Sequence, residues 1–149
     1  MIGDGLNMCD FTYVENAVHA HILAADHLKP GSPVCGQCYF ITNGQPIRFW
    51  AFIGTVLAET GCVGPTKNIS FRLAYAFAYV MELLHWLLGR LINFRPTITR
   101  HMVCIMACHH WFSHEKATRD FGYRPIVTLE DGLRQTISYF RQAVRRRHD

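Results

Sequence analysis

The sequence lacks several features that would assign it to a class at once. Residues 1–10 hold Asp4 and Asp10 and no long apolar run, so no cleavable signal peptide is recognisable. There is no internal repeat and no low-complexity linker, and no glycine-rich turn of the GxGxxG or GxxGxxG type follows Gly3, Gly5 or any other glycine. Charged residues make up only 17% of the chain against 50% hydrophobic residues, which argues against disorder. We therefore expect one globular domain on the cytosolic side.

Acidic residues are fewer than basic ones, and the formal net charge is +4. The excess is concentrated at the C-terminus, in Arg141, Arg145, Arg146 and Arg147. A solvated basic tail accounts for such a cluster better than a binding surface for a polyanion. We therefore expect no nucleic-acid partner.

Cysteine is not scarce, but an oxidising destination is not indicated, so the six thiols are expected to be reduced. Cys35 and Cys38 have the Cys-x-x-Cys spacing, and Cys104, Cys108 and residues 109–110 could form the second half of a zinc site. The second pair has three intervening residues, so the four-ligand pattern is incomplete. We expect no metal site, and we interpret the cysteines as buried small apolar residues.

Strand and helix patterns alternate along the chain. Residues 10–14 have the aromatic and β-branched types of a strand, and a helix is expected to begin at Glu15–Asn16 with Asn16 as its N-cap. Residues 38–43 form a second predicted strand, and a helix from Pro46 to Leu57 follows it. Strand–helix units of this kind predict an α/β fold with a parallel sheet, whose other strands must come from elsewhere.

Two helix starts are marked near the C-terminus. Ser113 is positioned to cap a helix that Gly122 ends. Thr128 is positioned to cap the last helix, and Asp131 stands three residues later, as in a capping box.

The most hydrophobic segment, residues 71–94, predicts one long helix. Glu82, His85 and Arg90 gather on one side of it. The opposite face carries apolar side chains: Leu73, Phe77, Val80, Leu84, Leu87 and Leu91. Because Glu82 lies near its middle, a membrane-spanning helix is the least favoured interpretation. A helix in a membrane interface or over an apolar cavity, and a core helix of a soluble domain, are equally compatible with the pattern.

Three stretches, "IGDGLNMCDFTYVENAVHAHILAA", "CYFITNGQPIRFWAFIGTVLAETG" and "FSHEKATRDFGYRPIVTLEDGLRQTISYF", occur in this order. Together they resemble the C-terminal part of the 3β-hydroxysteroid dehydrogenase family, which belongs to the extended short-chain dehydrogenases. The resemblance covers nearly the whole chain. It implies the last strands of a Rossmann fold plus a helical substrate-binding part, incomplete on its own, with residues 1–149 lacking the nucleotide-binding half.

The resemblance also implies an NAD- or NADP-dependent oxidoreductase that acts on the 3β-hydroxyl of steroids or sterols. The family's acid–base pair is a Tyr with a Lys four residues later, and no tyrosine here has a lysine at that spacing. No catalytic or cofactor-binding residue is therefore carried over, and the chain alone is expected to bind no cofactor and to be inactive. It is expected to be a fragment, a short isoform or an incomplete gene product.

The expected contribution of this part is the sterol pocket and a contact with the membrane surface. Tyr13 and Arg95 are the candidate substrate-binding residues, because polar-tipped side chains beside apolar material can orient a sterol. The structural alternatives are a core aromatic residue for Tyr13 and a helix-terminal or membrane-surface cation for Arg95. The resemblance implies the cytosolic face of the endoplasmic reticulum membrane, with the cytoplasm as the alternative location. A non-catalytic membrane- or lipid-binding module is the alternative function, and the oligomeric state stays open.

Overall fold

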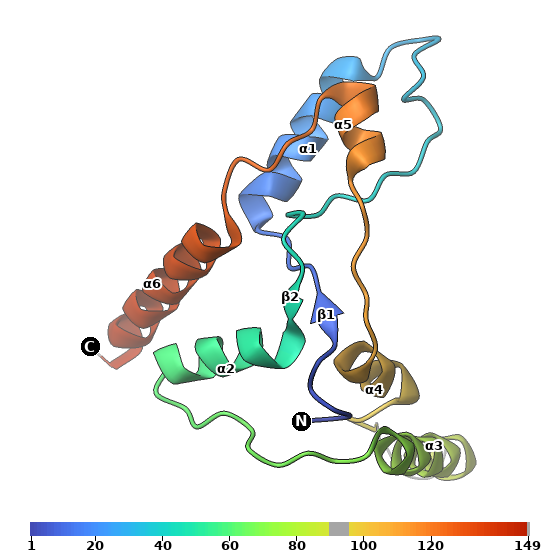
Figure 1. Ribbon diagram of the computed structural model, residues 1–149, viewed down its shortest axis with the longest axis vertical. Helices are drawn as coiled ribbons and strands as arrows, with labels where there is room; N and C mark the ends of the chain where they lie inside the picture. The colour runs from blue at the N-terminus through green and yellow to red at the C-terminus, as the bar shows by residue number, and fades with distance from the viewer. Residues whose placement is uncertain (90–95, 149) are drawn as a thin grey trace.

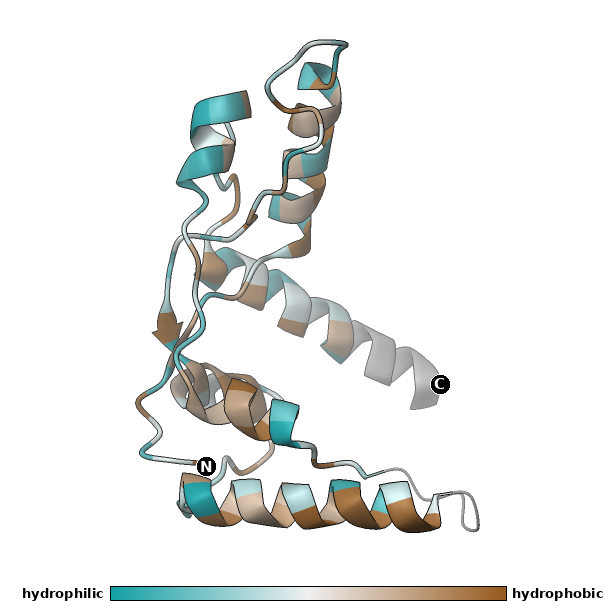
Figure 2. Cartoon of the chain, turned by 90° about the vertical axis from the view of Figure 1, so that its right-hand side faces the viewer, coloured by the Kyte–Doolittle hydropathy of each residue, from teal (hydrophilic) through white to brown (hydrophobic). Residues whose placement is uncertain are grey.

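The computed structural model describes residues 1–89 and 96–148. Its helices are α1 (Val14–His27), α2 (Phe49–Glu59), α3 (Phe71–Leu88), α4 (Arg100–Ala107), α5 (Glu115–Phe121) and α6 (Leu129–His148) (Figure 1). Two short strands, β1 (Met8–Cys9) and β2 (Ile47–Arg48), pair antiparallel, with Met8 opposite Arg48 and Cys9 opposite Ile47. Helices α1 and α5 lie at one end of the molecule, and α3 and α4 lie at the other (Figures 1 and 2).

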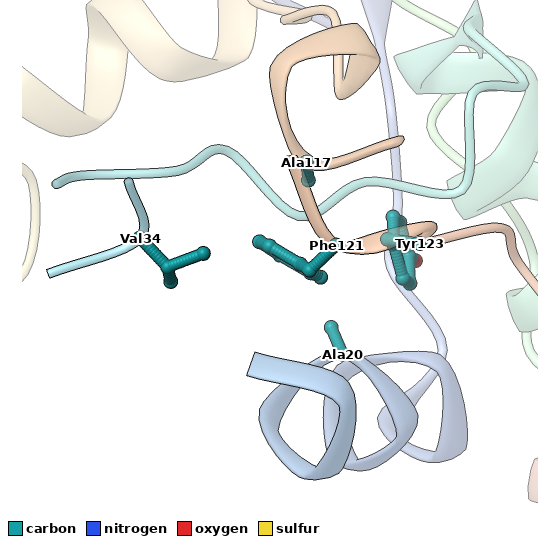
Figure 3. Packing of buried hydrophobic residues seen from close by; sticks show 5 residues of the cluster. All are labelled: Ala20, Val34, Ala117, Phe121 and Tyr123. Carbon is teal, nitrogen blue, oxygen red and sulfur yellow. The ribbon is translucent and has the colours of Figure 1, made fainter. Parts of the chain in front are cut away.

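The main apolar core lies between α1, α5 and the chain around residue 34. Its buried members are Ala20, Val34, Ala117, Phe121 and Tyr123, whose side chains point toward one another in Figure 3. The alanines allow α1 and α5 to approach closely, and the larger rings of Phe121 and Tyr123 fill the space between them. Burial, followed by the negative charge of Asp10, raises the pKa of the Tyr123 hydroxyl.

The predicted strands at residues 10–14 and 38–43 are wrong within the described parts of the chain. Residues 38–43 run without a paired strand, and three of their carbonyl groups accept hydrogen bonds from side chains instead. The hydroxyl of Tyr123 donates to the Thr42 carbonyl at 3.0 Å, and Lys116 donates to the Cys38 carbonyl at 3.1 Å. A strand needs a neighbouring backbone, whereas here side chains satisfy these groups.

The prediction of a parallel sheet is also wrong for the described residues. They contain only the small antiparallel pair β1–β2 and two isolated bridges, so the described chain is rich in helix with one small sheet. The helix predicted from Pro46 begins instead at Phe49, because Ile47 and Arg48 pair with β1.

Asn16 is not the N-cap of α1. The cap position is Tyr13, and Asn16 lies fully buried inside the helix. The side-chain Oδ1 of Asn16 accepts hydrogen bonds from the backbone amides of Ile126 and Val127 at 2.8 and 2.9 Å. Its side-chain Nδ2 donates to Asn43 Oδ1 and to the Val127 carbonyl, both at 2.7 Å. The side chain thus joins α1 to two distant segments, which its position in the sequence could not reveal.

The C-terminal helix signals are confirmed with small differences. Gly122 ends α5 with φ +73°, a left-handed conformation that favours glycine. Ser113 lies one residue before the cap His114, and its hydroxyl accepts from the Glu115 amide at 3.1 Å.

The start of α6 is also where the sequence placed it. The hydroxyl of Thr128 accepts from the Asp131 amide at 3.1 Å and donates to the Asp131 carboxylate at 2.7 Å. The carboxylate therefore contacts the cap hydroxyl rather than the cap N–H. Helix α4, in contrast, was not predicted.

Helix α3 confirms the long apolar helix up to Leu88, and the predicted continuation through residues 90–94 lies outside the described residues. Ala78 is fully buried, and α3 packs against α4. Arg100, the first residue of α4, donates from its amide and from Nε to the Glu82 carboxylate at 2.8 and 2.6 Å. Among the described residues, none of the helices has both the length and the apolar character that crossing a bilayer requires.

Candidate functional site

Tyr13 lies where the chain enters α1, facing α6. Its hydroxyl donates to Gln135 Oε1 at 3.0 Å, and its amide donates to Asn43 Oδ1 at 3.1 Å. A Cβ atom at Gly132 would lie only 2.6 Å from Cδ2 of the Tyr13 ring. The missing side chain of Gly132 therefore lets the ring lie directly against α6.

An apolar cavity of about 350 Å³ opens between α2 and α6, with Tyr13 on its wall. Phe52 stacks on Phe11 with ring centroids 4.0 Å apart, and these rings form part of the lining. The remaining lining residues are Thr12, Val56, Thr60, Leu129, Gly132, Leu133, Thr136, Ile137 and Phe140. Such a volume lies at the lower end of the range for small-molecule pockets, and an apolar lining with few polar groups suits a hydrocarbon ligand.

Charged side chains surround a neighbouring hollow along the same helices. Arg141 donates to the Glu59 carboxylate at 2.9 Å and to the Glu59 carbonyl at 2.8 Å. Arg134 forms ion pairs with Glu130 and Asp131, both at 3.2 Å. Acidic and basic side chains are matched in these exposed ion pairs, so the hollow has little net charge. The pairs themselves contribute little to the stability of the fold.

The second candidate surface is the apolar face of α3, which we define as Leu73, Phe77, Val80, Leu84 and Leu87. All five side chains are exposed, with Leu73 at 66% and Phe77 at 52%. Figure 2 shows α3 as largely hydrophobic along its length, at the end of the molecule. Contiguous exposed apolar surface of this kind marks an interaction site. The sequence predicted this face correctly for its described members.

Aromatic side chains lie along one flank of α3. Trp86 is 77% exposed, and Tyr79 is 50% exposed with the Arg100 guanidinium 5.2 Å from its ring centre. Glu82 turns toward α4, where the Arg100 amide and then its guanidinium hold the pKa of the Glu82 carboxyl below its usual value. The acidic residue that interrupts the apolar sequence thus lies on the side of α3 away from its apolar face, where Arg100 pairs with it.

Of the two site residues predicted from the sequence, the structure describes only Tyr13. Tyr13 lies on the cavity wall, and its hydroxyl is satisfied by Gln135, so both interpretations of this residue fit its position. Arg95 lies outside the described residues. Gly132 and Gln135 were missed, although a glycine inside a helical sequence is a signal of close packing.

The cysteines follow the expectation only in part. Cys9 is buried, and burial followed by the charge of Asp10 raises the pKa of its thiol. Cys35, Cys38, Cys62 and Cys108 are exposed, so their interpretation as buried apolar residues is wrong. Among residues 1–89 and 96–141, whose side chains the structure describes, His, Cys, Asp and Glu nowhere gather in a group that could hold a metal ion.

Comparison with known proteins begins with the family model of the 3-beta hydroxysteroid dehydrogenase/isomerase family, which matches residues 1–73. Sterol-4-alpha-carboxylate 3-dehydrogenase (decarboxylating) of Mus musculus is 41% identical over 94% of this chain. The resemblance to the 3-beta hydroxysteroid dehydrogenase/isomerase family is confirmed. A second relative of similar identity is 3beta-hydroxysteroid-dehydrogenase/decarboxylase isoform 1 of Arabidopsis thaliana, which is 42% identical over 94% of this chain. The chain spans 39% and 33% of the lengths of these two proteins.

Two solved structures share the fold of this chain. The crystal structure of gox2253 superposes with a TM-score of 0.62 at 24% identity, covering 92% of this chain and 38% of that one. UDP-glucuronic acid 4-epimerase from Bacillus cereus, in complex with NAD, superposes with a TM-score of 0.55 at 16% identity, covering 96% of this chain and 34% of that one. At these identities the likeness concerns the fold alone.

Proposed function

We propose that this chain forms the substrate-binding and membrane-contacting part of an NAD- or NADP-dependent oxidoreductase that acts on the 3β-hydroxyl of sterols. The observation that carries the proposal is the 41% identity, over 94% of the chain, to an enzyme named for a sterol carboxylate. The apolar cavity beside Tyr13 supports it, because a sterol is a rigid hydrocarbon plate that needs apolar walls and few polar contacts.

A chimera tests the catalytic part of this proposal. Residues 1–149 would replace the matching C-terminal segment of the mouse sterol-4-alpha-carboxylate 3-dehydrogenase, and NAD reduction with a sterol acid would be followed. We expect turnover to be retained, since the exchanged segment would supply an equivalent substrate-binding part. A chimera that binds NAD as the parent does, yet shows no turnover above a heat-killed control, would refute the proposal.

The membrane contact is assigned to the apolar face of α3. An interfacial helix buries its apolar face in the acyl boundary and keeps aromatic side chains at head-group depth. Leu73 and Phe77 on the apolar face, and Trp86 elsewhere on α3, are all exposed and available for these two contacts. Arg72 lies at the start of the helix, where it can meet anionic head groups. The location that we propose is the cytosolic face of the endoplasmic reticulum membrane.

Vesicle sedimentation tests the membrane contact. The triple variant Phe77→Ser, Val80→Ser and Leu84→Ser should abolish sedimentation with anionic vesicles, because it removes most of the burial term at roughly 25 cal/mol per Å² of apolar surface. Val14, Val18 and Ile22 of α1 are 63%, 52% and 57% exposed, so their replacement by Ser is the matched control and should change little. If both variants sediment with the vesicles to the same extent, the apolar face of α3 does not make the membrane contact.

The second candidate function is a non-catalytic lipid-binding module. The exposed apolar face of α3 favours it independently of the cavity, since this face needs no cofactor to bind lipid. The chimera separates the two functions: a lipid-binding module would sediment with vesicles but give no turnover in the chimera.

A further inference from the structure

Cys35 and Cys38 lie in the loop that follows α1, and the side chains of both are exposed. Only two residues separate them, so a bond between their sulfur atoms would close a small ring. The pair lies between α1 and β2, in a stretch without helix, and it lacks the helix N-terminus that activates a catalytic cysteine. The pair is therefore suited to being modified rather than to catalysis.

A tight turn bends the chain at Cys35. The amide of Gln37 donates to the carbonyl of Val34 at 3.3 Å, which closes the turn. Gly36, at its third position, has φ +70°, the left-handed value that a type II turn requires there. A disulfide needs its two Cα atoms within about 7 Å of each other. Because the chain is bent rather than extended, Cys38 follows Cys35 at short range.

The turn has room to adjust while the thiols approach. A Cβ atom added to Gly31 or to Gly36 would meet nothing within 4 Å, so these parts of the loop project into open space. The thiol of Cys35 donates to the carbonyl of Lys29 at 3.2 Å. A thiol is a weak donor and water can replace it at this exposed carbonyl, so the bond is lost at little cost.

Both ends of the loop segment are attached to the core between α1 and α5. Val34, directly before the pair, is buried and points toward Phe121 in Figure 3. Tyr39, directly after the pair, packs edge-on against Phe121 with ring centroids 4.9 Å apart. Lys116 of α5 donates to the carbonyl of Cys38 at 3.1 Å. A disulfide at the pair would therefore join two neighbouring core contacts covalently.

We propose that Cys35 and Cys38 form a reversible redox-modification site, which closes to a disulfide by exchange with a small-molecule disulfide and ties together the core contacts on either side. The thiolate of one cysteine attacks a sulfur of the small disulfide, which releases one small thiol and leaves a mixed disulfide. The thiolate of the other cysteine then attacks the protein sulfur of the mixed disulfide and releases the second small thiol. The pair loses two electrons to the small disulfide, and the two protons of its thiols end on the released thiols.

Exchange with glutathione tests the site, independently of the sterol proposal. The full chain, in mild detergent, would be equilibrated with mixtures of reduced and oxidised glutathione, quenched with acid and alkylated. Chymotryptic cleavage after Leu28 and Tyr39 isolates residues 29–39, which contain Cys35 and Cys38 and no other cysteine. We expect this peptide to escape alkylation and to have the mass of the reduced peptide less two hydrogens.

Cys62 is the matched control, because it is also exposed and its nearest cysteine in the sequence, Cys38, is 24 residues away. It should form only a mixed disulfide with glutathione. At a low share of oxidised glutathione, the closed pair should be at least about tenfold more populated than this mixed disulfide, because its second exchange step is intramolecular. Cys35→Ser leaves Cys38 without a partner, so Cys38 should then react as Cys62 does.

The consequence for the core is tested by unfolding in denaturant. Closure should raise the denaturant midpoint of the unchanged chain, and the midpoint of Cys35→Ser should not rise under the same oxidation. The inference is overturned if Cys35 and Cys38 carry glutathione to the same extent as Cys62, or if the pair cross-links only between two chains. An equal midpoint for the closed and the reduced chain would show that the disulfide does not tie the core contacts.

Discussion

Replacing Asn16 is the sharpest test of how the described elements are held together. Its side chain is fully buried, and Asn16→Ala would leave the amides of Ile126 and Val127 without the acceptor that now lies 2.8 and 2.9 Å away. The Val127 carbonyl would keep its hydrogen bond from Asn43 Nδ2 at 3.2 Å, and Asn43 Oδ1 would keep the one from the Tyr13 amide at 3.1 Å. Two orphaned donors are therefore the main cost.

Both N–H groups are only partly buried, so each costs about 1 kcal/mol when orphaned, the low end for such groups, which gives about 2 kcal/mol for the pair. The better helix propensity of alanine returns about 0.5 kcal/mol. We therefore expect Asn16→Ala to lower the free energy of unfolding by about 1.5 kcal/mol. Asn68→Ala is the control, because Asn68 is exposed, and it should cost less than about 0.5 kcal/mol.

The assay combines denaturant unfolding in mild detergent with amide hydrogen exchange. The amides of Ile126 and Val127 should lose protection in Asn16→Ala and keep it in Asn16→Asp, because the acidic side chain still offers an acceptor. Unchanged protection of these two amides in Asn16→Ala, or a loss of stability below about 0.5 kcal/mol, would show that Asn16 does not join α1 to the connector before α6.

Three further predictions concern acidity, cofactor turnover and exposed surface. The pKa of Glu82 lies below its usual 4.5, so its contribution to stability is present above pH 4.5 and is lost as the pH falls through the lowered pKa; thermal melts of Glu82→Gln should therefore fall less steeply below pH 4.5 than those of the unchanged chain, and parallel curves would contradict this. The 149-residue chain should not reduce NAD with any 3β-hydroxysteroid, because it has neither the glycine-rich turn nor the Tyr-x-x-x-Lys pair, and absorbance at the NADH band against a heat-killed control decides this. The apolar face of α3 should make the chain bind an apolar fluorescent dye strongly in dilute buffer, and Phe77→Ser with Leu84→Ser should reduce that signal; dye binding that matches a compact globular standard would disprove the exposure.

Local signals fixed by a few neighbouring residues were predicted well from the sequence. Gly122 ends a helix because its left-handed conformation suits a residue without a side chain, and Thr128 with Asp131 begins one because both partners lie within four residues. The apolar face of α3 follows from the helical period alone. The family resemblance likewise depended on the order of short stretches along the chain and needed no fold.

Features that depend on distant partners were decided only by the tertiary structure. Residues 38–43 have strand-forming side chains, yet a strand exists only beside another backbone, and here Lys116 and Tyr123 take that role. Asparagine is a common N-cap residue, but the side chain of Asn16 forms a hydrogen bond with the amide of Ile126, 110 residues away. Tyr13 becomes a cavity wall only because Gly132, on another helix, leaves room for its ring. Local preference fixes where a helix begins, whereas the burial and pairing of a polar side chain depend on what folding brings next to it.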